Sequence, residues 1–508
     1  MKNLLLIIVM IHSLTIYSQS ENEKFIYGKP EVGERYFNPI LTDFVADPSV
    51  VMFDSVFYLY GTTDINQGLT KMGPPVVWKS KDFVNWSFDG TILNMIDWDK
   101  PHKYIDNKGK ERNGYFRYWA PGKAVEMDGK YYLFPTIVTP DDKMGTYVVV
   151  ADHPEGPFQF INGESVFYDE PDKESVEAKP IVEDIDGEPF VDDDGKSYIF
   201  WRRRNASQMK TDFTGLIGDP IQVRTSFGGY SEGPVMFRRK DKYYYVYTLS
   251  GRENYCNAYM ISDESPLGPF KKPDGNGIFI HSDLNTQVWG PGHGNVFQVP
   301  GTDDYYFLYL EYGEGGTTRQ IFANKMSFNN DGTIQNQEVN FDGVGYLNGS
   351  DTRMNLALNA DIKASSELPE KKIERYIAPD PNKLKNMRVN ESNGQLAERY
   401  FQYGAPNIAD NSNGSCWRAA PDDKNPWVVV DLKNKQTVSS VEIAFTLPTY
   451  GHSWVLEKSN NGKKWTMCAR EDQKKVKSPH VVNGIGKARF LRLSVLEGEA
   501  GVWELKVY

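Results

Sequence analysis

The stretch Asp241-Lys242-Tyr243-Tyr244-Tyr245-Val246-Tyr247 joins a charged turn to an aromatic strand, and the same pattern returns four more times along the chain. The other copies are at residues 56–60, 129–134, 195–201 and 303–309. Aromatic residues favour strands, and the irregular spacing of the copies is typical of propeller blades with unequal loops. More short strand-like runs with turn residues, such as 146–150, lie between the copies. About four strands per repeat predict an all-β fold with a five-bladed β-propeller over residues 30–347. One large β-sandwich is the alternative.

The composition and the strand pattern of the sequence change after Asn348-Gly349-Ser350-Asp351. Lys-rich stretches follow, and then alternating strand-like runs at residues 427–432, 438–445 and 454–458. We therefore expect a second β-rich domain over residues 355–508.

The composition describes an acidic globular chain of 508 residues with 57 Lys and Arg against 68 Asp and Glu, a formal charge of −11. At roughly 100–200 residues per domain, the length allows two to four domains. A net negative charge repels polyanions, which argues against nucleic acid as the main partner. Aromatic residues make up 13% of the chain, a content suited to strands and to stacking on sugar rings.

Residues 1–20 are typical of a secretory signal, with Lys2, an apolar run at residues 4–10 and small polar residues at 13–20. The run is too short to span a bilayer, and no later segment approaches about 20 apolar residues. We expect an exported protein, periplasmic or secreted, without membrane insertion. Its three cysteines are too few for a disulfide framework. Cys416 and Cys468 could pair, and the sequence leaves this open.

Three acids sit in unusual settings, each one strand ahead of an aromatic repeat. Asp47 lies in Val45-Ala46-Asp47-Pro48, Asp186 in Ile185-Asp186-Gly187-Glu188, and Glu232 in Ser231-Glu232-Gly233-Pro234. The inner strands of a propeller meet at one axis, so these carboxylates can converge in one pocket and push each other's pKa apart. Glycoside hydrolysis needs such a set: one protonated acid for the leaving oxygen and one ionised carboxylate. Taken singly, an Asp before Pro is also a common turn residue.

At these motifs the first domain resembles glycoside hydrolase family 43, five-bladed propeller enzymes that cleave with inversion. Further matches are residues 79–86, 119–121, 153–158, 265–270 and 290–295. The resemblance implies that Asp47 is the general base, that Asp186 orients the acid and tunes its pKa, and that Glu232 is the general acid. The second domain, at 355–357, 425–432, 459–465 and 488–493, resembles the discoidin, or coagulation factor 5/8 type C, jelly-roll domain. In secreted carbohydrate-active proteins that domain often binds sugar.

The family resemblance suggests roles for five further residues. His293 matches a position near the axis that often helps to hold a calcium ion, and Arg319 matches an arginine that reaches sugar hydroxyls. Trp78, Trp119 and Trp289 are candidates for the pocket wall, although each could equally be core packing. No cofactor is expected to be required, with structural Ca²⁺ an option in both domains. The loop at residues 409–413 fits a cation-binding loop loosely, and Tyr450, His452 and Trp454 are candidates for a binding rim.

The sequence departs from the family pattern at two places, since Gly122-Lys123 follow Pro121 and Gly187 stands where a proline is usual. Both departures alter the pocket walls, so the substrate stays open. We expect an inverting glycosidase that removes terminal sugars from polysaccharide or oligosaccharide chains. An α-L-arabinofuranoside is the first choice, followed by a β-D-galactofuranoside, a β-xyloside or a β-1,3-galactan. A non-catalytic glycan-binding protein is the first alternative, and a structural or adhesion role carried by the terminal domain is the second. If the propeller alone is the enzyme, deletion of the residues after Asn348 should spare activity on small substrates.

Overall fold

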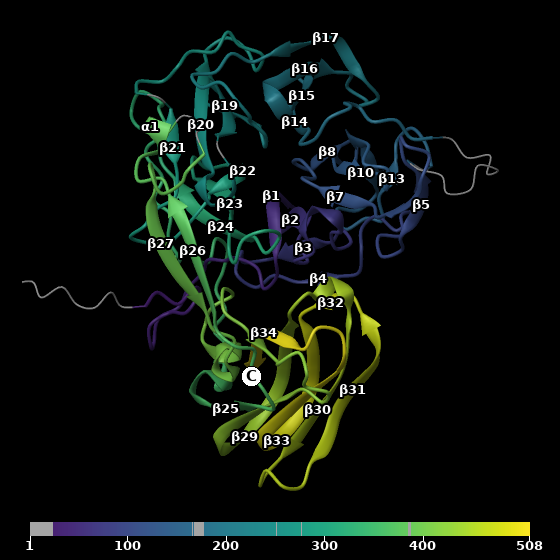
Figure 1. Cartoon of the computed structure of the whole chain (residues 1–508), viewed down its shortest axis with the longest axis vertical. Helices are drawn as coiled ribbons and strands as arrows, with labels where there is room; N and C mark the ends of the chain where they lie inside the picture. The colour runs from purple at the N-terminus through teal and green to yellow at the C-terminus, as the bar shows by residue number, and fades with distance from the viewer. Residues whose placement is uncertain (1–23, 165, 167–176, 250, 276, 385–387) are drawn as a thin grey trace, which may run out of the picture.

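The computed structural model describes residues 24–164, 166, 177–249, 251–275, 277–384 and 388–508, so the expected signal at 1–20 lies outside the described residues. The structure is built from strands, which confirms the predicted all-β fold (Figure 1). Sheets from the first two thirds of the chain surround a common centre, and the C-terminal strands form a second body beside them. Within the described ranges no helix is long and apolar enough to cross a membrane.

The ring contains five successive antiparallel units, which agrees with the predicted five-bladed propeller. The second unit is two short sheets, β7-β10-β11 and β8-β9-β12-β13, which we count as one blade because β9 and β10 are separated by only two residues. The first blade contains β1 (Val45–Phe53), β2 (Val56–Thr63) and β3 (Val77–Ser80), and the second contains β7 (Arg117–Trp119), β8 (Val125–Met127), β9 (Lys130–Leu133), β10 (Thr136–Val138), β11 (Met144–Thr146), β12 (Val149–Ala151) and β13 (Gln159–Phe160). The third blade contains β14 (Glu188–Val191), β15 (Ser197–Trp201), β16 (Asn205–Met209) and β17 (Leu216–Gln222). The fourth contains β18 (Val235–Arg239), β19 (Lys242–Leu249), β20 (Cys256–Ser262) and β21 (Ile278–Ile280), and the fifth contains β22 (Gly292–Gln298), β23 (Tyr305–Glu311) and β24 (Gln320–Met326).

The five aromatic repeats are the strands β2, β9, β15, β19 and β23, each paired with a neighbour on both sides. A strand in this position is covered on both faces by adjacent blades, so apolar and aromatic residues fill it without alternation. In β19, Tyr244, Tyr245 and Tyr247 are all fully buried. Burial of these rings holds the blades together and fixes where the inner strands begin.

One residue at the entrance of each inner strand has a left-handed backbone. These residues are Asp47 (φ 50°), Ala120 (φ 37°), Asp186 (φ 63°), Gly233 (φ 52°) and His293 (φ 31°). At Asp47 and His293 the pairing register also shifts, between Ala46 and Ser49 in β1 and between Gly292 and Asn295 in β22. Such bulges re-aim a side chain, and residues held at positive φ cluster at functional sites. The turn recurs five times and supplies the site residues from four of the blades.

The C-terminal body holds a sheet in the order β28-β34-β29-β33-β30-β31, with β25 paired to β29. Its strands are β25 (Asp361–Ala364), β28 (Trp417–Arg418), β29 (Trp427–Phe445), β30 (His452–Ser459), β31 (Thr466–Lys475), β33 (His480–Glu497) and β34 (Gly501–Val507). The two runs predicted at 427–432 and 438–445 are one long strand whose pairing shifts between Asp431 and Gln436. Trp417, Val428 and Leu456 belong to its buried core. We call this body the sandwich.

His452 and Trp454 are core residues, so their prediction as a binding rim is wrong. His452 is fully buried and stacks on Phe445 with ring centroids 4.4 Å apart. The indole N–H of Trp454 donates a hydrogen bond to His480 at 3.1 Å. Tyr450 is half-buried, and Lys71 of the propeller lies over its ring. Cys416 and Cys468 are not paired with each other.

The sequence did not predict the hairpin of β26 (Lys371–Ile377) and β27 (Gln395–Phe401), which runs along the side of the ring (Figure 1). The remaining strands are short pairs, β5 (His102–Ile105) with β6 (Glu111–Gly114) and β4 (Phe88–Asp89) with β32 (Lys477–Ser478). The helical segments are α1 (Pro381–Leu384), η1 (Gly68–Thr70), η2 (Arg202–Arg204), η3 (Arg252–Asn254), η4 (Leu356–Asn359), η5 (Ala405–Ala409) and η6 (Pro448–Tyr450).

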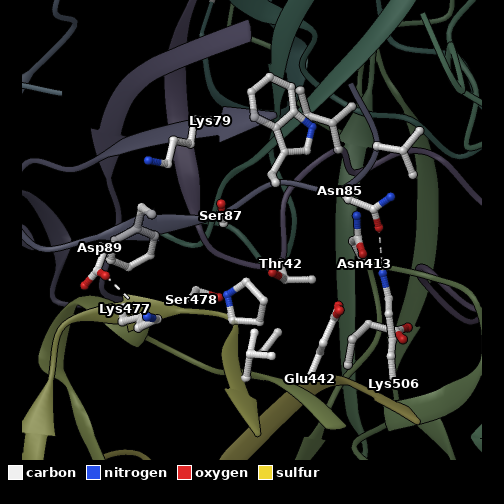
Figure 2. Close-up of a pocket in the computed structure, with 18 of the residues that line it drawn as sticks. Thr42, Lys79, Asn85, Ser87, Asp89, Asn413, Glu442, Lys477, Ser478 and Lys506 are labelled. Carbon is white, nitrogen blue, oxygen red and sulfur yellow. Dashed lines mark hydrogen bonds and ion pairs between the residues drawn. The ribbon is translucent and has the colours of Figure 1, made fainter. Parts of the chain in front are cut away.

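The β4–β32 pair joins the first blade to the sandwich, and a cleft of about 410 Å³ opens beside it (Figure 2). Two polar contacts cross the cleft: Lys477 pairs with Asp89 at 3.3 Å, and Lys506 donates to Asn85 at 3.3 Å. None of the three predicted catalytic carboxylates lines it.

Candidate active site

The structure brings Asp47, Asp186, Glu232 and His293 together at the centre of the propeller, from four different blades. The Nδ1 atom of His293 lies 3.3 Å from Oδ1 of Asp47 and 3.8 Å from Oδ2 of Asp186. The backbone N–H of Gly233, next to Glu232, donates to Oδ2 of Asp186 at 3.1 Å. Asp47 and Asp186 are 7% and 6% exposed, so their charges act on one another with little screening by water.

Asp47 is surrounded by groups that favour its ionised form. The hydroxyl of Thr62 donates to Oδ2 at 2.6 Å, and Nη1 of Arg319 lies 3.5 Å from Oδ1. Burial by itself would raise the pKa of Asp47, but Arg319, His293 and the Thr62 hydrogen bond outweigh it and lower the pKa. This carboxyl is therefore an ionised acceptor at neutral pH.

Arg319 is held by a buried carboxylate, Asp64, that the sequence analysis missed. Nε and Nη2 of Arg319 donate to the two oxygens of Asp64 at 2.8 and 2.9 Å, and its backbone N–H donates at 3.1 Å. Asp64 follows the buried end of β2 and has no exposed surface. The sequence shows only a charged residue directly after a strand, which does not by itself single out a site residue. This fork-to-carboxylate geometry fixes the guanidinium beside Asp47.

Glu232 is oriented by two tyrosines that the sequence did not indicate. The hydroxyls of Tyr230 and Tyr255 donate short hydrogen bonds to Oε2 and Oε1. Tyr255 is half-buried, and burial together with the Glu232 charge raises its pKa well above the ordinary value, so it remains a donor. The backbone N–H of Glu232 donates to Thr248 at 3.1 Å. Glu232 itself is half-buried, so its carboxyl can reach a bound molecule.

Asp186 and His293 lie between Asp47 and Glu232. Burial is the largest influence on Asp186, and with the charges of Glu232 and Asp47 it raises the pKa to about 7 against the opposing effect of His293. Burial works against a charge on His293, but Asp47 and Asp186 outweigh it and raise the pKa of the imidazole. A His⁺ among three carboxyls supplies internal compensation for their charge.

The residues around His293 do not form a set of metal ligands. Among the described ranges, no group of three or more His, Cys, Asp or Glu side chains could hold an ion. In the predicted cation loop of the sandwich, the hydroxyl of Ser415 and the backbone N–H of Ser412 donate to Asp410 at 2.6 and 3.1 Å. Burial raises the pKa of Asp410 to about 7.

A second layer of polar groups underlies the carboxylates, and both departures from the family pattern lie beside it. Glu188 accepts the backbone N–H of Lys123 at 2.8 Å and the side-chain amide of Asn295 at 3.1 Å. Burial raises the pKa of Glu188 to about 7. At Gly187 an added Cβ would stand 2.4 Å from the methyl group of Thr146, so the glycine permits a close approach there.

Of the three predicted tryptophans, one is the chain neighbour of a residue that lines the site, and two lie in the core. Trp119 is half-buried and precedes Ala120, whose N–H donates to the Thr62 hydroxyl that holds Asp47. Trp78 is 1% exposed and packs edge-on against Phe88 in the core. Trp289 is 1% exposed with Arg399 stacked on its ring at 3.6 Å. The prediction of pocket walls at Trp78 and Trp289 is wrong because sugar has no access to either ring.

Known proteins resemble this chain in both of its parts. Residues 36–334 match the model of glycosyl hydrolases family 43, and residues 390–506 match that of the F5/8 type C domain. A beta-D-galactofuranosidase of Aspergillus niger is 25% identical over 316 residues, 60% of this chain and 86% of that protein. A non-reducing end alpha-L-arabinofuranosidase of Bacteroides ovatus is 26% identical over 269 residues, 52% of this chain and 45% of that protein. A solved structure described as a glycoside hydrolase is 38% identical, with a TM-score of 0.80, and the match covers 93% of this chain and 99% of that one.

Proposed function

Because the chain belongs to glycosyl hydrolases family 43 and is therefore a glycoside hydrolase, we propose that it removes terminal sugars from polysaccharide side chains with inversion. The observation that carries this proposal is the contrast between two carboxyls at one axis. Asp47 lies beside the cationic groups of Arg319 and His293 and is kept ionised, whereas the hydrogen bonds described for the Glu232 carboxyl come from two neutral tyrosine hydroxyls. A carboxyl paired with cations is suited to the base, and a carboxyl among neutral donors to the acid.

In the proposed reaction Glu232 gives its proton to the departing glycosidic oxygen. The hydroxyls of Tyr230 and Tyr255 donate to its two oxygens and set the direction of the carboxyl. Asp186 accepts the N–H of Gly233, the residue after Glu232, and so holds the backbone that carries the acid.

Asp47 takes the proton from a water that attacks the opposite face of the sugar ring, so the anomeric configuration inverts. Thr62 fixes one oxygen of Asp47 and leaves Oδ1 toward Arg319 and His293. Among the hydrogen bonds of the described residues, none joins Asp47 to Glu232. Inversion requires the two carboxyls to stand about 6.5–9.5 Å apart so that water fits between them and the sugar.

An α-L-arabinofuranoside is the first candidate substrate and a β-D-galactofuranoside the second. The two sugars share the configuration of their furanose ring, and galactofuranose carries one more hydroxymethyl group on its side chain. The relatives include an enzyme named for each sugar. Arg319, held by Asp64, offers Nη1 toward the site as a donor for a sugar hydroxyl. Xylosides and galactans remain further members of the test panel. Export rests on the signal predicted at residues 1–20.

The test is hydrolysis of aryl furanosides and pyranosides by the wild type, Glu232→Gln and Asp47→Asn, with Asp193→Asn as a control. Asp193 is an exposed carboxylate of the same propeller. We expect each active-site variant to lose at least about a hundredfold in kcat/KM and the control to match the wild type. Proton NMR of the first product should show inverted configuration.

The leaving group distinguishes the acid from the base. A good leaving group departs without a proton, so Glu232→Gln should recover much of its rate on dinitrophenyl glycosides. Asp47→Asn should recover none, because the water still lacks its base. Equal losses on good and poor leaving groups by both folded variants would contradict the assignment. Binding of sugar without turnover of any substrate would favour the glycan-binding alternative.

A further inference from the structure

The hairpin β26–β27 belongs to the C-terminal third of the chain but packs along the fourth and fifth blades of the propeller (Figure 1). Ile373 and Ile377 are buried on one side of it, whereas Lys371 and Lys372 are exposed. It packs on Trp289 and binds the carbonyl of Gln287 through Arg399. Further polar contacts bind it to two loops that both lead to the carboxylates at the axis.

The first loop is residues 252–255, between β19 and β20. The side-chain amide of Asn254 donates to the carbonyl of Tyr376 at 2.9 Å, and its Oδ1 accepts the N–H of Ala378 at 2.8 Å. Arg375 lies 3.5 Å from Glu253. Both hydrogen-bonding groups of the Asn254 side chain are therefore used to bind the backbone at the end of β26.

The same loop delivers Tyr255, one residue later, to Glu232. Its ring is wedged against Gly292, where an added Cβ would stand 2.3 Å from Cγ of Tyr255. With so little free space, a shift of Asn254 moves the phenol, and with it one of the two donors that direct Glu232.

The second loop is residues 312–319, between β23 and β24. Nη1 of Arg399 donates to Glu311 at 2.7 Å and to the carbonyl of Gly313 at 3.2 Å, and both charged side chains are fully buried. Tyr403 and Lys371 bind the two oxygens of Glu314 at 2.6 and 2.8 Å.

This loop ends at Arg319, the guanidinium that lies against Asp64 and Asp47. The hairpin and Tyr403, which lies just beyond it, thus hold the start of the loop, and Asp64 holds the end of the loop. The loop is fixed from both sides, so the position of Arg319 depends on a segment that belongs to neither the blades nor the sandwich sheet.

We infer that the hairpin β26–β27 is a positioning element of the active site, which holds Tyr255 on Glu232 and Arg319 on Asp47 through the loops 252–255 and 312–319. The inference rests on the proposed function only where it assigns the donated proton to Glu232 and the binding of the sugar to Arg319. None of the hairpin's own residues touches the reacting atoms. Its effect on the reaction is exerted through the two loops.

The test pairs two variants with a matched control. Asn254→Ala removes the bonds between the first loop and β26, and Tyr403→Phe removes one bond between β27's end and the second loop. Lys372→Met is the control, because Lys372 pairs only with Glu374 and Glu398 inside the hairpin. Hydrogen exchange on the three folded proteins should show faster exchange at residues 252–255 in Asn254→Ala and at 312–319 in Tyr403→Phe. The control should match the wild type at both loops.

Kinetics then shows what the loops do. Asn254→Ala should lower kcat by about 10- to 100-fold, because the acid is misdirected by a fraction of an ångström, and should alter the alkaline limb of the pH profile. Tyr403→Phe should act mainly by raising KM, because Arg319 binds the sugar. Asn254→Asp, which keeps the acceptor for Ala378, should recover part of kcat.

Exchange at both loops that is the same in the variants and the wild type would overturn the inference, whatever the activity. Faster exchange with wild-type kcat and KM would overturn it as well. A wild type that hydrolyses nothing overturns the proposed function instead, and the exchange data still decide whether the hairpin holds the loops.

Discussion

At the scale of single residues, the site works by setting ionisable groups against one another in a buried space. Asp47 is stabilised as an anion by Arg319 and His293, and burial raises the pKa of Asp186 to about 7 a few ångströms away. The sequence could predict the three carboxylates because each stands in a recognisable motif. It could not predict Asp64 or Tyr255, because their roles depend on which side chains meet across blades rather than on their neighbours in sequence.

Asp186→Asn should remove a step near pH 7 from the kcat/KM profile. Burial raises the pKa of Asp186 to about 7, so in the wild type this carboxyl changes its charge beside His293 and the N–H of Gly233 in that range, whereas an asparagine does not ionise. kcat/KM measured from pH 4 to 9 checks this, with Asp193→Asn as the surface control. A profile with the same shape between pH 6 and 8 in the variant and the wild type would show that the charge of Asp186 does not act on the reaction.

Glu188→Gln should make stability less dependent on pH. Burial raises the pKa of Glu188 from 4.5 to about 7, so the folded state holds this proton more tightly than the unfolded state. The resulting stability is fully present below pH 4.5 and is lost as the pH rises through about 7, a loss of about 3 kcal/mol at most. A glutamine does not ionise. Urea unfolding at pH 5 and pH 8 should therefore show a smaller decline for the variant, and parallel declines would contradict this account.

At the scale of elements, the inner strands place the site because each begins with a turn at positive φ. The aromatic strands could be predicted from their Tyr and Phe runs. The left-handed entrances could not, since Ala120 and His293 are not residues that sequence rules assign to such a conformation. The hairpin β26–β27 escaped prediction because its charged sequence is typical of a surface, yet Arg399 is fully buried against Glu311 and Trp289.

Gly233→Ala should damage one of these entrances. At φ 52° an alanine is strained, and its Cβ would stand 2.7 Å from the ring of His293. We expect a loss of about 1–3 kcal/mol in unfolding free energy and a fall in kcat, since Glu232 and His293 must both shift. Gly195→Ala is the matched control, because Gly195 has φ 79° with no atom within 4 Å of the added Cβ. Equal effects of the two substitutions on kcat would contradict the role of this close contact.

At the scale of the whole molecule, the C-terminal third is part of the structure around the active site. Tyr309 and Phe322 of the propeller share a buried core with Ile373, Phe401 and Trp503. The expectation that the propeller is an independent enzyme followed from treating the two resemblances as separate units. Sequence motifs define what each unit resembles, but they carry no information about the surface that one unit buries against the other.

A chain that ends at Asn348 should therefore be unstable or inactive, contrary to the sequence-based expectation. Tyr309 and Phe322 would lose the apolar side chains that bury them, and Glu311 would lose its partner Arg399. Thermal unfolding and kcat/KM on the best aryl glycoside would measure the loss. A fragment of residues 1–348 that folds with wild-type kcat/KM would contradict the prediction.

The pairing of β4 with β32 joins the segment after the first blade to a strand of the sandwich through the backbone. A binding domain on a flexible linker samples many distances from its enzyme. The gain in binding then depends on the effective concentration that the linker sets. Here hydrogen bonds set the distance and direction from the sandwich to the carboxylates at the axis. A sugar polymer could contact both parts of such a protein at once only where its side chains recur at that one spacing.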